Sequence, residues 1–240
     1  MRSVLVTGAS RGLGRAIALV FGALRSRVAV HYHQHEAEAR QAAEIIVCMQ
    51  GEALLCQADV ASAGDVAVMF NTLRERWGTL DVLVNNAAVA DDDLLLRMTD
   101  ERWQRVLDVD LGGALMCSRH AAAMMPDGGH IVNIASLSGA VGRAGQANYA
   151  TAKAALIGLT RSLAAELGPR NVRVNAVLPG YLPTDMGRAA PDAMQQALQE
   201  SVLARLGDPD EVAGFVAHLC DTKTISGQVF SLDSRLWGGT

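Results

Sequence analysis

Short apolar runs alternate with longer stretches of helical periodicity along the whole chain. The apolar runs have four to six residues and are rich in Val, Ile and Leu, which is typical of strands buried on both faces. The predicted strands are Ser3–Val6, Arg27–His31, Ala53–Gln57, Val82–Asn85, His130–Ile134, Arg173–Leu178 and Gln228–Leu232. The predicted helices are Gly12–Leu24, Glu36–Met49, Ala63–Trp77, Asp100–Met124, Tyr149–Leu167 and Pro209–Leu219.

This order of elements predicts an α/β fold. Near-continuous apolar strands separated by helices indicate a seven-stranded parallel sheet with helices on both faces. The alternation continues over residues 1–240 without a linker or a low-complexity stretch. We therefore expect a single doubly wound, Rossmann-type domain.

Composition narrows the classes of function. Half of the residues are hydrophobic and 19% are charged, which argues against disorder. The net charge of −4 offers no basic surface for nucleic acid, and no apolar run approaches the length of a membrane span. The four cysteines are scattered without the spacing of a metal site, so reduced thiols and a cytoplasmic location are expected. The first strand begins at Ser3, which leaves no room for a signal peptide.

A glycine-rich turn follows the first predicted strand. It reads Thr7-Gly8-Ala9-Ser10-Arg11-Gly12-Leu13-Gly14 and leads into the first helix. Glycines at such a turn let the backbone approach a pyrophosphate, which then lies at the positive end of the helix. A tight turn alone would need similar residues, but its position in the first βα unit favours dinucleotide binding.

The end of the second strand indicates which dinucleotide binds. NAD binding usually requires a carboxylate there for the ribose 2′-hydroxyl. This chain has His31-Tyr32-His33 instead, and Arg11 supplies a cation for a 2′-phosphate. NADP(H) is therefore favoured. The alternating histidines also suggest a metal site, but no Cys or Asp partner accompanies them, so no metal is expected.

Further cofactor contacts are expected after the third and fourth strands. Asp59-Val60 places a carboxylate where it can accept a hydrogen bond from the adenine amino group. The segment Asn85-Asn86-Ala87-Ala88 follows the fourth strand at the sheet edge where doubly wound folds bind ligands. The asparagines suit an Asn-rich turn that joins two strands equally well.

A tyrosine and a lysine four residues apart form the candidate catalytic pair. Tyr149 and Lys153 lie one turn apart on a predicted helix, so the hydroxyl and the ammonium can approach one volume. A nearby cation stabilises phenolate and lowers a tyrosine pKa, which suits proton transfer to a carbonyl oxygen. The spacing alone is common by chance. Ser136, at the end of the fifth strand, and the nucleotide signature make it specific.

These motifs in this order resemble the short-chain dehydrogenase/reductase family over nearly the entire chain. The segments Gly145–Tyr149 and Val174–Gly180 are similar to those of its 3-oxoacyl-[acyl-carrier-protein] and acetoacetyl-CoA reductases. The resemblance implies that Tyr149 is the general acid, that Ser136 polarises the carbonyl, and that Lys153 lowers the tyrosine pKa and binds the nicotinamide ribose. It also implies a substrate lid at about 185–206, with these residues near the nicotinamide: Pro179, Gly180, Leu182 and Thr184.

Three positions depart from the family pattern. Asp110 stands where the family usually has the Asn of a catalytic tetrad, and we count it among the candidate catalytic residues. Ala88 replaces a glycine near the cofactor. Ser234-Arg235 replaces a Gly-Gly in a region that builds a subunit interface in tetrameric relatives. Small residues on the two long helices, with Leu236 and Trp237 in the tail, still predict a homotetramer or a homodimer.

The resemblance implies NADPH-dependent reduction of a 3-ketoacyl thioester carried by acyl carrier protein or coenzyme A. Arg170 and Arg173 could dock an acidic carrier, although Pro126-Asp127-Gly128-Gly129 offers an acid where a basic residue is common. A solvated helix-end charge explains Arg170 equally well. The alternatives are another carbonyl, quinone or pteridine reductase, a sugar or alcohol dehydrogenase, and a non-catalytic cofactor-binding subunit.

Overall fold

Seven parallel strands form one sheet in a computed structural model that describes residues 1–126 and 128–236. The order across the sheet is β3-β2-β1-β4-β5-β6-β7. Each predicted strand is confirmed to within one residue at either end. The strands are β1 (Ser3–Val6), β2 (Arg27–Tyr32), β3 (Glu52–Gln57), β4 (Val82–Asn85), β5 (Gly129–Ile134), β6 (Val172–Leu178) and β7 (Val229–Ser231).

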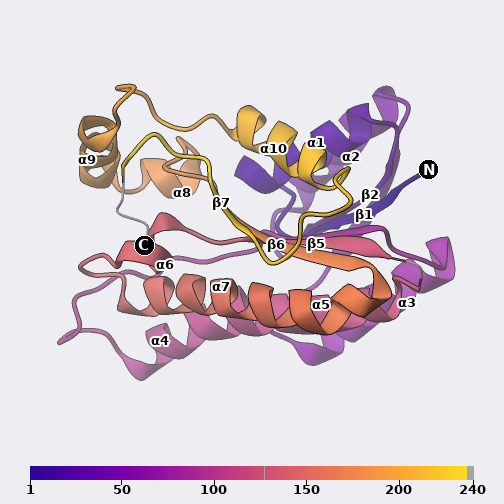
Figure 1. Cartoon of the computed structure of the whole chain (residues 1–240), viewed down its shortest axis with the longest axis horizontal. Helices are drawn as coiled ribbons and strands as arrows, with labels where there is room; N and C mark the ends of the chain where they lie inside the picture. The colour runs from indigo at the N-terminus through magenta and orange to yellow at the C-terminus, as the bar shows by residue number, and fades with distance from the viewer. Residues whose placement is uncertain (127, 237–240) are drawn as a thin grey trace.

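Helices cover both faces of this sheet, and Figure 1 shows the two layers on opposite sides of the strands. One face carries α1 (Gly12–Ala23), α2 (Glu36–Cys48) and α10 (Pro209–Leu219). The other carries α3 (Ala63–Trp77), α4 (Asp100–Leu107), α5 (Gly113–Ala123) and α7 (Ala147–Leu167). The predicted α/β class and the seven-stranded parallel sheet are therefore confirmed.

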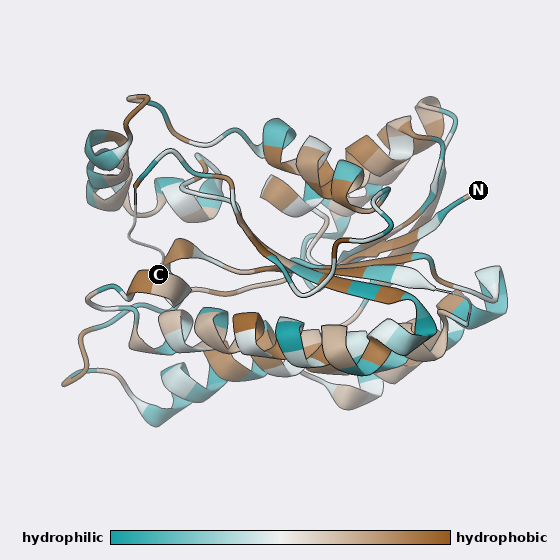
Figure 2. Ribbon diagram, viewed as in Figure 1, coloured by the Kyte–Doolittle hydropathy of each residue, from teal (hydrophilic) through white to brown (hydrophobic). Residues whose placement is uncertain are grey.

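The strands are mostly apolar because each face of the sheet packs against its own helices. In β1, Val4 and Val6 belong to the core under α1, α2 and α10, whereas Leu5 belongs to the core under α3, α5 and α7. Successive side chains of a strand point to opposite faces. A sheet covered by helices on both faces therefore needs apolar residues at both odd and even positions of its strands. Figure 2 shows strands that are largely brown with some teal patches, between helices that carry both colours.

The sheet order reverses direction at β1, which positions the ligand site. Strand β1 pairs with β2 on one side and with β4 on the other. The connections from these strands therefore leave in opposite directions and open a crevice at the carboxyl ends of β1 and β4. The glycine-rich turn and the Asn85–Ala88 segment both begin at this edge.

The prediction of one continuous helix over Asp100–Met124 is wrong. A π-helical turn, η1 (Asp108–Gly112), separates α4 from α5. A π turn widens the helix by one residue, which the apolar periodicity of the sequence does not reveal, and such turns often occur at functional sites. This one directs Asp110 into the protein, where 1% of the residue is exposed.

Four short or late elements were not predicted as helices. They are α6 (Leu137–Val141), the 3₁₀ turn η2 (Gly168–Arg170), α8 (Asp185–Arg188) and α9 (Pro191–Glu200). The last two lie within the segment 185–206, which Figure 1 shows beside the end of the sheet. Across residues 1–126 and 128–236, no helix is both long enough and apolar enough to cross a membrane. Asp127 and Trp237, both used in the sequence predictions, lie outside the described residues.

Candidate active site

One cleft of about 1840 Å³ opens at the carboxyl edge of the sheet. It is lined by every residue that the sequence predicted to bind the cofactor, from the glycine turn to Thr184. Ser136, Tyr149 and Lys153 line it too, whereas Asp110 lies behind it. The structure thus brings together segments that are more than 170 residues apart in the chain.

Ser136 is held where β5 ends and α6 begins. Its backbone is extended, and its hydroxyl caps α6 by accepting a hydrogen bond from the Ser138 N–H at 3.2 Å. The same hydroxyl also acts to lower the pKa of Tyr149, whose side chain lies near it in the cleft. A serine is well suited to both contacts, because a hydroxyl can donate and accept.

Tyr149 and Lys153 lie on successive turns of α7 and point into the same volume. The Lys153 Nζ atom is 5.4 Å from the centre of the Tyr149 ring. The ammonium donates a hydrogen bond to the Ile134 carbonyl at 3.1 Å. Because Ile134 ends β5, this bond fixes the lysine against the strand that leads to Ser136. The three groups therefore share one environment.

Burial opposes the pKa shift expected for Tyr149. Its surroundings disfavour the phenolate and raise the pKa of Tyr149 above 10, although Lys153 and the Ser136 hydroxyl act to lower it. Lys153 therefore acts in the expected direction, but the effect of burial on the pKa of Tyr149 is larger. Burial acts to lower the pKa of Lys153, but the charges of Asp110 and Tyr149 outweigh it and raise the pKa.

Asp110 makes a buried ion pair with Lys153. One carboxylate oxygen lies 3.1 Å from the Lys153 Nζ atom, and the side chains are 0% and 3% exposed. The other oxygen accepts a hydrogen bond from the Val89 N–H at 2.8 Å. Burial raises the pKa of Asp110, while Lys153 and the Val89 N–H act against that rise. Asp110 therefore contacts Lys153 through its side chain.

The glycine turn has the shape required for a dinucleotide. Gly8 and Gly12 have φ of 65° and 55°, which favour glycine. A Cβ atom on Gly14 would lie 2.3 Å from the Gly8 carbonyl oxygen, so only glycine allows α1 to start this close to the turn. The Asn86 amide donates hydrogen bonds to the Thr7 and Gly8 carbonyls and joins the ends of β1 and β4. The residues present fit a bound pyrophosphate.

His31 supports this turn from behind. Its Nδ1 atom accepts a hydrogen bond from the Gly8 N–H at 2.9 Å, and its Nε2 atom lies 3.1 Å from the Ala58 carbonyl oxygen. Accepting at one nitrogen and donating at the other requires a neutral ring. Burial accordingly lowers the pKa of His31 to about 4. His33, two residues further along, is exposed.

Arg11 and Asp59 both line the cleft. The Arg11 side chain is 54% exposed, and its guanidinium lies 3.6 Å from Asp185 at the start of α8. Asp59 accepts a hydrogen bond from the Ala61 N–H at 2.9 Å, which stabilises the turn before α3. Gly180 has φ of 77°, and a Cβ there would lie 3.1 Å from the Leu232 carbonyl oxygen.

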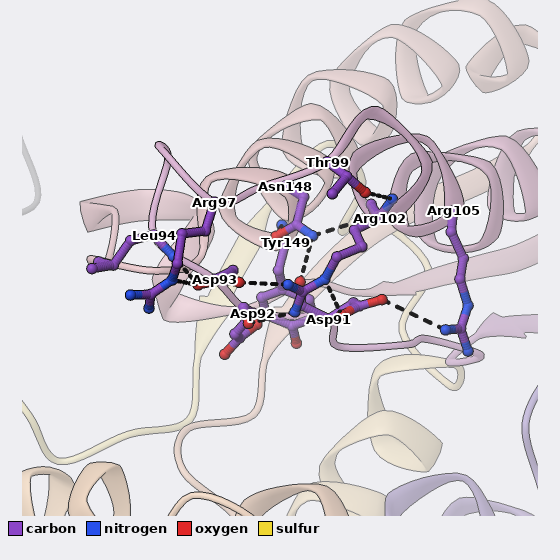
Figure 3. Close-up of polar contacts among 10 residues, drawn as sticks. All are labelled: Asp91, Asp92, Asp93, Leu94, Arg97, Thr99, Arg102, Arg105, Asn148 and Tyr149. Atoms are coloured by element: carbon purple, nitrogen blue, oxygen red, sulfur yellow. Dashed lines mark hydrogen bonds and ion pairs between the residues drawn. The ribbon is translucent and has the colours of Figure 1, made fainter.

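Sequence reasoning missed a polar cluster that holds the loop beside Tyr149. Figure 3 shows Arg102 between Asp91 and Asp93, with 2.6 Å from its guanidinium nitrogens to each carboxylate. Asn148, 0% exposed, donates to the Asp91 carbonyl at 2.9 Å. The three consecutive acids at 91–93 were visible in the sequence, but nothing there indicated Arg102 as their partner.

The arginines considered for carrier docking already have partners. Arg170 donates to the Ala122 and Met125 carbonyls at the end of α5. Arg173 binds the Lys223 carbonyl and contacts His130. Arg170 therefore donates to carbonyl groups near the end of α5, a different helix from the one that precedes it in the chain.

A parallel doubly wound sheet with a glycine turn and a Ser–Tyr–Lys group at its crevice defines a class of nicotinamide-dependent oxidoreductases. The family described as enoyl-(acyl carrier protein) reductase matches residues 8–234. A 3-oxoacyl-[acyl-carrier-protein] reductase from Synechocystis sp. is 43% identical, covering 97% of this chain and 95% of its own. The reductase of the same name from Staphylococcus aureus is 41% identical, covering 98% of each chain. The chain belongs to the short-chain dehydrogenase/reductase family.

Solved structures agree with this assignment. A Serratia marcescens short-chain dehydrogenase/reductase mutant superposes with a TM-score of 0.93 at 34% identity, covering 97% of this chain and 96% of its own. The angucycline C-6 ketoreductase LanV, with bound NADP, gives 0.90 at 34% identity, covering 96% and 93%. The predicted family is therefore confirmed.

Proposed function

We propose that this protein reduces 3-ketoacyl thioesters to 3-hydroxyacyl thioesters with NADPH. The observation that carries the proposal is the convergence of Ser136, Tyr149 and Lys153 on the cleft of the glycine turn. Relatives at 41% and 43% identity over nearly full length bear the name 3-oxoacyl-[acyl-carrier-protein] reductase. The acyl group is carried by acyl carrier protein or by coenzyme A.

The proposed roles follow from the charge that develops during reduction. Bound reduced nicotinamide supplies the hydride. As the carbonyl carbon accepts it, negative charge grows on the oxygen, and the Ser136 and Tyr149 hydroxyls donate hydrogen bonds to that oxygen. Tyr149 then transfers its proton to the oxygen as general acid. Lys153 has three N–H donors and donates one to the Ile134 carbonyl, so an N–H remains for the nicotinamide ribose.

We propose that the cofactor is NADP rather than NAD because of the charged residues at the adenosine end of the cleft. Strand β2 ends at Tyr32 and is followed by His33-Gln34, so the carboxylate that would repel a 2′-phosphate is missing there. Arg11 is exposed at the edge of the cleft and can bind that phosphate in a charge-assisted contact. The similar ketoreductase LanV has NADP bound in its solved structure.

The segment 185–206 is proposed as the substrate lid. Helices α8 and α9 lie in it and line the cleft. The Tyr181 hydroxyl donates to the Gly187 carbonyl at 2.7 Å, and a Cβ on Gly187 would lie 2.1 Å from the Leu182 carbonyl oxygen. These contacts define the base about which the segment can close over a substrate.

We also propose a homo-oligomer and a cytoplasmic location. Leu115 on α5 is 47% exposed beside α7, whose outer positions include Ala154 and Gly158. An apolar residue among small ones suits close packing of a second copy. The four cysteines are all free, as expected in a reducing compartment.

NADPH oxidation over a panel of carbonyl substrates tests the function. The panel contains acetoacetyl-CoA, longer 3-ketoacyl-CoA and 3-ketoacyl carrier-protein thioesters, quinones, pterins and simple sugars and alcohols with NADP⁺. We expect the highest kcat/KM with a 3-ketoacyl thioester and a preference for NADPH over NADH. A thousandfold preference for NAD would contradict the proposal, as would turnover confined to pterins, quinones or free ketones.

A further inference from the structure

The carboxylate of Asp110 gives this site one more buried negative charge than an amide would. It lies 3.1 Å from the Lys153 ammonium, and its side chain is fully buried. The hydrogen bond from the Val89 N–H at 2.8 Å holds it in place from the loop that follows β4. Asp110 lies on the π turn η1, so the backbone itself directs this carboxylate toward Lys153.

Four side chains act on the proton of Tyr149. Lys153 and the Ser136 hydroxyl favour the phenolate, whereas Asp110 and Asp92 favour the protonated hydroxyl. They come from α7, the end of β5, η1 and the loop after β4, which are the elements around the ring. Asp92 accepts a hydrogen bond from Gln146 at 2.7 Å. Asp110 is the acid that contacts the lysine itself.

A carboxylate beside an ammonium weakens the electrostatic effect of that ammonium on its other neighbours. An isolated Lys153 would present a full positive charge to Tyr149 and strongly favour phenolate. An ion pair presents a dipole, whose field falls off faster with distance. Asparagine in the same place would keep an acceptor for the Val89 N–H but would leave the lysine charge uncompensated.

We propose that Asp110 is a positioning residue whose charge, acting through Lys153, keeps Tyr149 protonated and extends proton donation by the site to higher pH. Tyr149 then transfers its proton to the carbonyl oxygen under conditions in which an asparagine variant has already lost it. This inference rests on the proposed reductase function for its kinetic consequence. The effect of Asp110 on the protonation of Tyr149 does not require substrate.

The test measures the protonation of Tyr149 directly. The chain has three tyrosines, Tyr32, Tyr149 and Tyr181, so ¹³Cζ-tyrosine labelling gives three NMR signals, and Tyr149→Phe assigns one. In Asp110→Asn we expect the Tyr149 titration midpoint to move to lower pH, by on the order of one unit, a tenfold change in its protonation constant. The titration is carried out with and without NADP⁺.

Two further measurements separate charge from structure. Asp108→Asn removes the same charge two residues away on the same turn, where the side chain is exposed and bonded to Gln104, and it should leave the midpoint unchanged. In the wild type, ¹³Cγ-aspartate NMR should show Asp110 ionised throughout the range in which Tyr149 titrates. That measurement does not depend on the variant folding. A neutral Asp110 in this range would overturn the proposal.

The pH dependence of reductive kcat completes the test. In Asp110→Asn the alkaline limb of the kcat profile should move to lower pH, so that the ratio of variant to wild-type kcat falls about tenfold between neutral and high pH. An unchanged Tyr149 midpoint in Asp110→Asn overturns the inference even if the enzyme reduces thioesters. A shifted midpoint in a protein that reduces none of them overturns the proposed function and leaves the electrostatic role intact.

Discussion

At the scale of single residues, burial decides the role of His31. The sequence places it at the end of β2 among the residues predicted to bind the cofactor, and it does line the cleft. Both of its ring nitrogens, however, face backbone groups of Gly8 and Ala58. His31 therefore shapes the glycine turn from behind, and a 2′-phosphate would meet Arg11 and the exposed His33 instead.

Because His31 is buried, we expect the protein to lose stability in mild acid. Its pKa is lowered from 6.5 to about 4, so between these values the unfolded chain binds a proton that the folded chain does not. Stability therefore falls as the pH falls from about 6.5 to about 4, by roughly 3 kcal/mol from this residue. Urea denaturation at several pH values measures the slope.

Two variants check that assignment. His31→Ala leaves two buried backbone groups unpaired and should lose about 2–4 kcal/mol at neutral pH, with a shallower acid slope. His33→Ala, on an exposed side chain, should keep both the stability and the slope. An acid slope that is the same in His31→Ala as in the wild type would show that His31 is not the titrating group.

The spacing of Tyr149 and Lys153 could be predicted from sequence, but their environment could not. Helical periodicity places the two residues on one face, and the structure shows their groups together. The pKa of Tyr149 depends on burial and on Asp110, which is 39 positions earlier in the chain. A pattern of apolar and polar positions carries no information about such a contact.

At the scale of elements, the sequence predicted strands better than helix interruptions. Two-sided burial makes each strand a short apolar run between turns, so β1 and β4 were predicted with their exact ends. The helix over 100–124 keeps its periodicity across η1, because one extra residue in a turn barely changes the apolar face. Two features of the sequence could have predicted α9. They are a proline at its first turn, Pro191, and two buried alanines one turn apart, Ala193 and Ala197.

The close approach of α1 to the glycine turn gives an element-scale prediction. Gly14→Ala would place a Cβ 2.3 Å from the Gly8 carbonyl oxygen and 2.4 Å from the Asn86 amide nitrogen, so the helix must move away from β1. We expect a loss of about 1–3 kcal/mol in unfolding free energy and a drop of tenfold or more in NADPH affinity. Urea denaturation and NADPH fluorescence titration measure these.

Gly64→Ala on α3 is the matched control. Its Cβ would meet only the Ser62 hydroxyl at 3.8 Å, so the substitution should stabilise the helix by a few tenths of a kcal/mol to about 1 kcal/mol and leave NADPH binding unchanged. Equal effects of the two substitutions would mean that the contact of α1 with the turn is unimportant.

At the scale of the whole molecule, we expect the protein to self-associate through the outer surface of α5 and α7. Leu115 is 47% exposed on α5, and the neighbouring α7 presents small residues. Sedimentation at micromolar concentration should show a dimer or a tetramer. Leu115→Glu should shift that equilibrium toward monomer, because it buries an unpaired charge in the contact.

Val68→Glu makes the same change at a residue of α3 that is 66% exposed, and it should leave assembly intact. Monomer as the sole wild-type species would contradict the prediction. A dissociating Val68→Glu would place the contact on the α3 side of the molecule instead.

The role of Tyr149 as the acid is tested most directly by removing its hydroxyl. In Tyr149→Phe, with NADPH binding monitored by fluorescence, we expect NADPH affinity to stay close to that of the wild type. Reduction of the best 3-ketoacyl thioester should fall by at least about a hundredfold, as expected for loss of a general acid. Turnover within a few-fold of the wild type in this variant would contradict the account.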